Sequence, residues 1–290
     1  MELVIRVPGS CGELLQGFCG QEPLLLTCPI DCYSTVRVRP GQGRLVGGGP
    51  KAKKAFQLAK DYVQAQDLPY DFYLSSDLAK GKGMASSSAD IAAVIAAVAA
   101  VTKYMLSEKI ICKLATRIEP TDSVFCRGLT LFQYRSGKIL RQFSPTPLLK
   151  ILAFDGGGRV DTLPFQAAYD AAWQKASPLV RTRFFQALQL LDQPLTRENL
   201  AQAATISSTI QAELFSKTSL RPFLTGYKKW GALGVNIAHS GSVVGLLFSP
   251  EWPDMALRKL AGKITAVFPA YQYLKVFHLQ SGGIWLQRKE

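Results

Sequence analysis

A glycine- and serine-rich stretch, residues 80–90 (KGKGMASSSAD), carries the groups that an anion-binding loop needs. Its two glycines let the backbone approach a ligand closely, and its three serines supply hydroxyl groups. The apolar run that follows, residues 91–101, predicts a buried helix. If this helix begins at the serines, its free N–H groups and the positive end of its dipole point into the loop. A phosphate group would fit there.

The stretch matches neither common nucleotide-binding pattern. The P-loop needs Gly-x-x-x-x-Gly-Lys-Ser/Thr, and the dinucleotide-binding turn needs Gly-x-Gly-x-x-Gly. A turn that caps a core helix explains the same residues equally well. Other segments therefore have to decide between a phosphate-binding loop and a structural cap.

Two carboxylates three residues apart, Glu119 and Asp122, follow a predicted helix that Pro120 ends. On one rigid bend both could face a single site, where carboxylates hold Mg²⁺ or act as a general base. The alternative is a helix end followed by an Asx turn.

A third polar group, Ser10, Glu13 and Gln16, is interleaved with glycines, which leave room beside these side chains. Such an arrangement is typical of a substrate pocket, although a polar turn without a ligand uses the same residues. The two histidines, His239 and His278, are too few for most metal sites and catalytic triads.

The composition predicts a folded protein, with 48% hydrophobic and 19% charged residues in 290. This length suits two lobes that share an interface. Pro145 and Pro147 mark the expected boundary, which gives lobes of residues 1–147 and 148–290.

The net charge of +13 suits a nucleic acid, an anionic membrane or a phosphorylated small molecule. Lysines and arginines are scattered, and the densest cluster, Lys51, Lys53 and Lys54, is interpreted as the solvated face of a helix. We therefore expect no nucleic-acid partner. The longest apolar run has about half of the roughly 20 residues that span a bilayer, so no membrane partner is expected either.

The chain is predicted to be cytoplasmic, because its first residues do not read as a signal peptide. In that reducing compartment its six cysteines are expected to be free thiols. The absence of a Cys-x-x-Cys pair argues against a zinc site.

Strands and helices are predicted throughout the chain. Residues 8–13 read as a turn between strands at 3–7 and 34–39, and a strand at 71–74 leads into the glycine-serine stretch. The other predicted helices are residues 52–66, 108–117, 165–174, 178–191, 196–214, 220–230 and 253–263; the other strands are 129–134, 139–143, 150–154, 243–248, 272–279 and 284–287.

Three tracts in this order, residues 7–17, 81–90 and 231–245, resemble the three motifs of the galactokinase, homoserine, mevalonate and phosphomevalonate kinase (GHMP) superfamily. Four shorter stretches, SCGELLQG (10–17), CPIDCYST (28–35), GKGMASS (81–87) and EPTDS (119–123), resemble the L-threonine kinases of adenosylcobalamin synthesis. The third tract departs from the family, since it reads Ser-Gly-Ser-Val at 240–243 in place of a longer glycine string.

This resemblance implies an α+β, two-lobed GHMP-kinase fold with ATP and substrate in the cleft between the lobes. It implies transfer of the γ-phosphoryl group to the hydroxyl of L-threonine. The product, O-phospho-L-threonine, would feed the aminopropanol linker of the corrinoid. L-Serine or L-homoserine as the acceptor remains an alternative, and so does a non-catalytic basic binding protein on the same scaffold.

The resemblance also implies roles for single residues. Ser87 and Glu119 would hold Mg²⁺, and Asp122 would lie at the acceptor hydroxyl, where we hypothesise that it accepts the proton. Lys82 would help to stabilise the transferred phosphoryl group. The ATP-binding residues would be Lys80, Gly81, Lys82, Gly83, Met84, Ala85, Ser86, Ser87 and Ser88. Ser10, Glu13 and Gln16 would line the amino-acid pocket, and either Glu13 or Asp31 would pair with the substrate ammonium.

Overall fold

The computed structural model describes residues 2–158, 162–192 and 194–289. Its helices are α1 (Pro50–Tyr62), α2 (Ser86–Val101), α3 (Glu108–Thr116), α4 (Thr162–Gln174), α5 (Pro178–Leu190), α6 (Arg197–Leu214), α7 (Arg221–Gly226) and α8 (Asp254–Val267). Short 3-10 helices flank α7 at Thr218–Leu220 and Tyr227–Trp230, so the helix predicted at 220–230 is present as α7 followed by a 3-10 helix.

The strands are β1 (Glu2–Cys19), β2 (Glu22–Pro40), β3 (Leu45–Val46), β4 (Tyr70–Ser76), β5 (Leu129–Gln133), β6 (Lys138–Phe143), β7 (Lys150–Asp155), β8 (Gly234–Ile237), β9 (Val243–Phe248), β10 (Gln272–His278) and β11 (Trp285–Lys289). Within the described ranges they form one 11-stranded sheet. Its main path runs β10-β7-β9-β8-β1-β2-β4-β3; β11 pairs with β1, β5 with β2, and β6 with β5.

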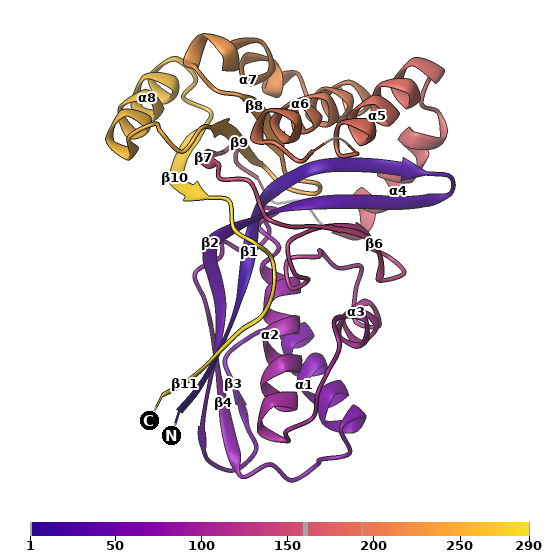
Figure 1. The fold of residues 1–290 in the computed structure, drawn as a ribbon, viewed down its shortest axis with the longest axis vertical. Coiled ribbons are helices and arrows are strands. Elements are labelled where there is room, and N and C mark those ends of the chain that lie inside the picture. The colour runs from indigo at the N-terminus through magenta and orange to yellow at the C-terminus, as the bar shows by residue number, and fades with distance from the viewer. Residues whose placement is uncertain (1, 159–161, 193, 290) are drawn as a thin grey trace.

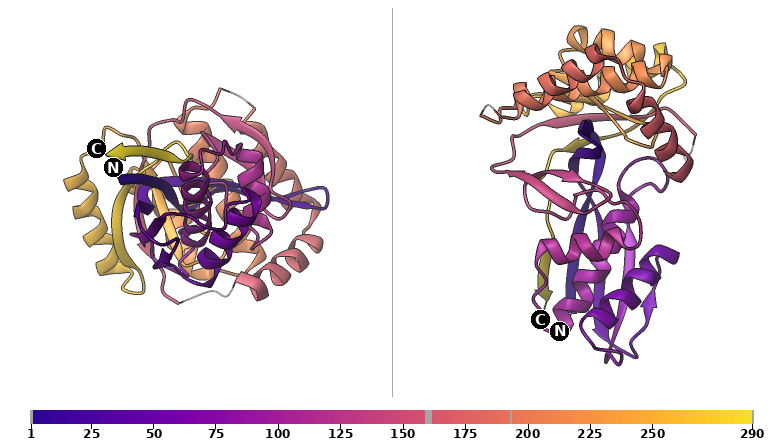
Figure 2. Two further views of the ribbon diagram at one scale, coloured as in Figure 1. Left: turned by 90° about the horizontal axis from the view of Figure 1, so that it is seen from below. Right: turned by 90° about the vertical axis from the view of Figure 1, so that its right-hand side faces the viewer.

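The molecule has two lobes, stacked one above the other in Figure 1. Strands β3 and β4 with helices α1 to α3 make the lower lobe, and β7 to β10 with helices α5 to α8 make the upper one. The long strands β1 and β2 run through both, and the helices of the upper lobe form a layer over their far end (Figure 2, right). The predicted α+β, two-lobed fold is thus confirmed.

Helix α2 lies in the core of the lower lobe. It packs against α1, β1 and β2, and its residues from Ser88 to Val98 are buried except Ala96. A helix that is apolar on every side, as this Ala- and Val-rich segment is, is stable only when other elements enclose it. The buried helix predicted from the sequence is therefore confirmed, and it starts at Ser86.

The turn predicted at residues 8–13 is wrong, because these residues belong to the single strand β1. Their pairing with β2 is interrupted by register shifts between Pro8 and Ser10, between Ser10 and Glu13, and between Glu13 and Leu15. Gly12 has φ of 67°, and a Cβ there would lie 2.5 Å from the carbonyl carbon of Ile237. Proline and glycine here mark bulges in a strand, which use the same residue types as turns.

The division of the chain after residue 147 stays a proposal. Strand β11 pairs with β1 antiparallel from Glu2–Lys289 to Arg6–Trp285, so the end of the second lobe's sequence returns to the sheet of the first. Figure 1 shows the two marked ends of the chain side by side at the bottom of the lower lobe. Within the described ranges, no helix has the length and apolarity needed to cross a membrane.

Candidate active site

A cavity of about 410 Å³ lies where the glycine-serine loop, the start of α2 and the 119–122 segment come together. Glu13 reaches it from β1, and His239 reaches it from the loop between β8 and β9. Of the predicted ATP-binding residues, the cavity lining includes Lys80, Gly81, Gly83, Met84, Ala85, Ser86, Ser87 and Ser88. Segments that are remote in the sequence therefore share one site.

The loop before α2 has a backbone that few residue types adopt. Gly81 and Gly83 have φ of 72° and 78°, and Ala85, at the N-cap, lies in the left-handed region with φ of 52°. A non-glycine residue held there costs about 1–3 kcal/mol, and such strain is concentrated at ligand sites. The bend brings the first turn of α2 to the cavity, where its N–H groups have no partner within the helix. These amides and the helix dipole make an anion-binding surface.

The loop is held by the first and third tracts of the resemblance. The Ser10 amide donates to the Met84 carbonyl at 3.0 Å. A Cβ on Gly83 would lie 2.4 Å from that of Ala238, and one on Gly241 would lie 2.1 Å from the Lys82 carbonyl oxygen. The third tract therefore supports the loop through close backbone packing, which needs glycine at 241.

Lys82 lies outside the cavity lining. Its Nζ pairs with Asp155 Oδ2 at 2.7 Å and donates to the Gly158 carbonyl at 2.9 Å. Asp155 also accepts from Ser242. Although burial raises the pKa of Asp155, these bonds from Lys82 and Ser242 bring it below its usual value. The predicted role of Lys82 at the phosphoryl group would require the Lys82–Asp155 ion pair to open.

Ser87 and Glu119, the predicted metal ligands, are in direct contact. The Ser87 hydroxyl donates to one oxygen of Glu119, and Lys51 Nζ donates to the other. The described residues hold no cluster of three or more His, Cys, Asp or Glu side chains that could bind a metal by themselves. A hydroxyl and a carboxylate fit Mg²⁺, which takes oxygen ligands and commonly completes its shell with phosphate oxygens and water.

Lys51, Lys53 and Lys54 are all exposed, as the interpretation of a solvated helix face predicts, but Lys51 also contributes to the cavity. Its ammonium pairs with Glu119, and the residue lines the cavity from the start of α1 although 53% of its side chain is exposed. The signal in the sequence was its place directly after a glycine run and Pro50, at a second helix N-terminus.

Asp122 lies beside Glu119 at the cavity and bonds to the next serine of α2. The Asp122 amide donates to Ser88 Oγ at 3.0 Å, and Ser88 Oγ lies 3.3 Å from Asp122 Oδ2. Burial raises the pKa of Asp122 to about 6, with a further contribution from the negative charge of Glu119. A carboxylate with this pKa is ionised at neutral pH and still basic enough to accept a proton.

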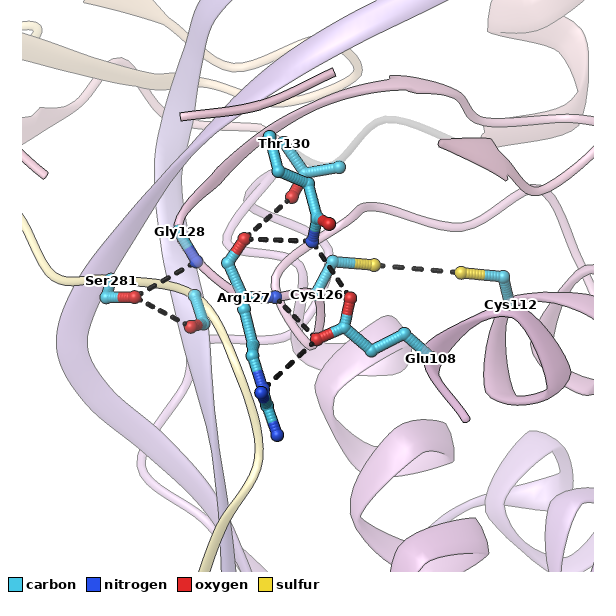
Figure 3. A network of polar contacts seen from close by, with 9 residues as sticks. Glu108, Cys112, Cys126, Arg127, Gly128, Thr130 and Ser281 are labelled. Carbon is cyan, nitrogen blue, oxygen red and sulfur yellow. Dashed lines mark hydrogen bonds and ion pairs between the residues drawn. The ribbon is translucent and has the colours of Figure 1, made fainter. Parts of the chain in front are cut away.

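The chain after Asp122 is anchored by the network in Figure 3. Glu108 on α3 accepts from the Arg127 amide at 3.1 Å, and Ser281 accepts from the Gly128 amide at 3.0 Å. The buried free thiols of Cys112 and Cys126 lie 3.6 Å apart, one on each side of the 119–122 segment in sequence. These contacts fix both ends of the segment that carries Glu119 and Asp122.

The four predicted substrate residues differ in their position relative to the cavity. Glu13 is buried at the cavity; burial raises its pKa well above the usual value, and the charge of Asp122 adds to this. Ser10 and Gln16 are buried just behind the cavity, where Ser10 bonds to the 83–84 backbone and Gln16 to His239. Asp31 lies elsewhere, paired with His278 Nδ1 at 2.8 Å. Of the two candidates for the substrate ammonium, only Glu13 lines the cavity.

Thr121, Tyr134 and His239 are among the cavity residues that the sequence did not assign to a site. Tyr134 follows β5, and its backbone carbonyl accepts from the Thr121 amide at 3.0 Å. His239 is packed against the rings of Tyr134, Phe165 and Tyr169. A lone tyrosine or histidine carries no local signal of a site, since only the folded chain brings it to the cavity.

Comparison with known proteins agrees with this fold. Residues 51–127 match the family model described as GHMP kinases N terminal domain. A crystal structure of mevalonate kinase superimposes with a TM-score of 0.74 at 14% identity, over 97% of this chain and 99% of that one. A putative homoserine kinase from Listeria monocytogenes gives a TM-score of 0.65 at 18% identity, over 99% of this chain and 100% of that one.

Two sequences have higher identity over nearly the full length. The L-threonine kinase of Salmonella typhimurium is 32% identical over 98% of this chain and 95% of its own. That of Citrobacter freundii is 30% identical over 98% of this chain and 99% of its own. The chain belongs to the GHMP kinases. It is accordingly a phosphotransferase that uses ATP, with a divalent metal, to phosphorylate a hydroxyl group of a small molecule.

Proposed function

We propose that this enzyme phosphorylates the side-chain hydroxyl of L-threonine and releases O-phospho-L-threonine for the aminopropanol linker of adenosylcobalamin. The observation that carries the proposal is the identity of 30–32% to two L-threonine kinases over 98% of the chain. The cavity supports it, because it places an anion-binding helix start beside two carboxylates. Six free cysteines, four of them buried, favour a reducing compartment, and we propose the cytoplasm.

The chemistry needs positioning and charge neutralisation, because charge in phosphoryl transfer spreads over the equatorial oxygens. The first-turn amides of α2 would bind the phosphates of ATP, and Lys80 adds a positive charge at the cavity. Mg²⁺ held by Ser87 and Glu119 would, when bound, neutralise negative charge on the phosphate oxygens. Asp122 would orient the acceptor hydroxyl and accept its proton, which moves to a carboxylate oxygen as the hydroxyl oxygen bonds to the γ-phosphorus and the bond from that phosphorus to ADP breaks.

The proposal is tested by coupled ADP release with Mg²⁺ and L-threonine, L-serine or L-homoserine. We expect L-threonine to give the highest kcat/KM. The methyl group that separates it from serine is worth only about 1–3 kcal/mol, so serine should be phosphorylated about 10- to 200-fold less efficiently. A serine preference would make this a serine kinase. Absence of ADP release with all three would contradict an amino-acid kinase, and salt-sensitive binding of RNA would then favour the non-catalytic alternative.

The metal site is tested by Glu119→Gln, which preserves shape and removes charge. The Mg²⁺ concentration for half-maximal activity should rise by at least about 10-fold, the lower end of what even outer-shell partners of a metal ligand cost. Titration of Mn²⁺ binding by electron paramagnetic resonance gives a second measurement. Glu251→Gln, which removes an exposed carboxylate paired with Arg197, is the matched control. An unchanged Mg²⁺ dependence would remove Glu119 from the metal site.

A further inference from the structure

The cavity gathers buried polar atoms that have no partner in the protein. Among the described residues, nine buried side-chain nitrogen or oxygen atoms lack a hydrogen bond. Four of them belong to residues that line this cavity: Glu13 Oε2, Thr121 Oγ1, Tyr134 OH and His239 Nε2. Each of these residues is at most 9% exposed. A buried polar atom without a partner costs about 1–3 kcal/mol, so such a group calls for a ligand.

Two of these atoms are hydrogen-bond acceptors, and for His239 the neighbours fix the tautomer. Gln16 Nε2 donates to the Ile237 carbonyl at 3.4 Å, which turns Gln16 Oε1 toward His239 Nδ1 at 2.9 Å. An amide oxygen only accepts, so Nδ1 carries the proton and Nε2 presents a lone pair to the cavity. Burial, together with the charges of Lys217 and Arg135, lowers the pKa of His239 to about 3, so the ring stays neutral.

The other two atoms belong to hydroxyl groups, which can donate. Thr121 and Tyr134 are joined through their backbones, and the Tyr134 and His239 rings lie 5.3 Å apart. The Arg135 guanidinium lies 5.6 Å from the Tyr134 ring centroid. Burial raises the pKa of Tyr134 to about 12, so its proton is retained for donation. Arg135 is itself paired with Asp170 at 2.5 Å, so the two hydroxyls are the donors that this part of the cavity offers to an anion.

We propose that these four residues bind the zwitterionic head group of the amino-acid substrate: Glu13 and His239 Nε2 accept from its α-ammonium, while the hydroxyls of Tyr134 and Thr121 donate to its α-carboxylate. This inference rests on the proposed function and deepens it. The arrangement satisfies every unpartnered atom of the cavity with one ligand. It also leaves the side-chain hydroxyl of that ligand for Asp122, which lines the same cavity as Glu13.

Deletion of one donor hydroxyl gives the first test. L-Threonine and L-threoninol, which has no carboxylate, are titrated calorimetrically into the protein with Mg²⁺ and a non-hydrolysable ATP analogue. Tyr134→Phe should weaken L-threonine binding by about 10- to 100-fold, the usual cost of a hydrogen bond to a charged group, and leave L-threoninol within about 2-fold. Tyr73→Phe, an exposed tyrosine on β4, is the matched control. Equal weakening of both ligands, or of neither, would overturn the carboxylate assignment.

The roles of Glu13 and His239 as acceptors for the α-ammonium are tested with 2,3-dihydroxybutanoate, the analogue of threonine that has no ammonium group. Glu13→Gln should weaken L-threonine and L-threoninol by about 10- to 100-fold and leave 2,3-dihydroxybutanoate unchanged. His239→Gln, whose amide oxygen can replace Nε2, should bind L-threonine more tightly than His239→Asn, which is too short. Loss of affinity for all three ligands together would show that Glu13 only maintains the shape of the pocket.

A measurement on the unmodified protein does not depend on how the variants fold. With ¹⁵N-labelled histidine there are two side chains to assign, His239 and His278, and His278→Gln identifies each. We expect His239 as the Nδ1–H tautomer from pH 5 to 9, with its Nε2 resonance shifted by L-threonine. An Nε2–H tautomer would overturn its role as acceptor. If the wild type turns over L-threonine while these tests fail, only this inference is lost; if it neither binds nor phosphorylates any amino acid, the proposed function fails.

Discussion

Replacing Asp122 by asparagine is expected to lower kcat by about 10²- to 10⁴-fold with little change in KM for ATP, because the variant keeps the shape of the residue and loses its basicity. Stopped-time measurement of O-phospho-L-threonine gives the rate. In the wild type, kcat/KM should fall tenfold per pH unit below about pH 6, where Asp122 becomes protonated, and the variant should lack this dependence. A near-normal kcat would reduce Asp122 to a positioning residue.

Thermal unfolding distinguishes lost chemistry from lost structure. Burial raises the pKa of Asp122 from 3.8 to about 6 in the folded protein, so the ionised carboxylate opposes folding above pH 6. The asparagine variant carries no such charge and should melt at a higher temperature than the wild type at pH 8. This difference should vanish as the pH falls below about 4, where Asp122 is protonated in both states. A lower melting temperature at pH 8 would show that the side chain stabilises the fold.

Gly241→Ala should lower kcat/KM for ATP by about 10²-fold. The new methyl group would lie 2.1 Å from the Lys82 carbonyl oxygen and 2.5 Å from the Gly83 amide nitrogen. Ordinary contact begins at 3.4 Å, so the loop and the third tract must separate by about 1 Å. A misplacement of about 1 Å in a catalytic arrangement can cost about 10²-fold. Steady-state kinetics and equilibrium binding of a fluorescent ATP analogue measure the effect.

The control for this variant is Gly262→Ala. Gly262 lies within α8, and a Cβ there meets nothing within 4 Å. The same change of one methyl group should leave kcat/KM unaltered and stabilise the protein by about 0.5–1 kcal/mol, because alanine is the better helix former. Normal ATP affinity in Gly241→Ala would mean that the loop moves freely and that the third tract does not hold it.

The fold was predictable wherever one segment had a single physical solution. The run of residues 91–101 is apolar on every face, so only an enclosed helix could accommodate it, and α2 is that helix. The segment from Pro8 to Glu13 was ambiguous, because proline and glycine serve both turns and bulges. Long-range contact with Ile237 decided in favour of a bulge, and a local pattern contains no information about that contact.

Some residues of the candidate site could likewise be predicted from the sequence, and others could not. Ser87, Ser88, Glu119 and Asp122 could be singled out because each pair lies in a short segment of unusual composition. Lys82 and Asp155, 73 residues apart, carry no sign in the sequence that they pair. Tyr134 and His239 acquire significance through atoms left without partners, a property that exists only in the folded protein.

The return of β11 to β1 has a consequence for synthesis on the ribosome. Residues Glu2–Arg6 pair with Trp285–Lys289 in the folded protein. The ribosome therefore makes nearly the whole chain after the first of these segments and before the second. Until β11 emerges, this edge of β1 is an unpaired strand that can pair with a neighbouring nascent chain. The helices of the lower lobe can fold early, but its sheet is completed late. Removal of β11 would therefore impair the solubility of the amino-terminal lobe, far away in sequence from the cut.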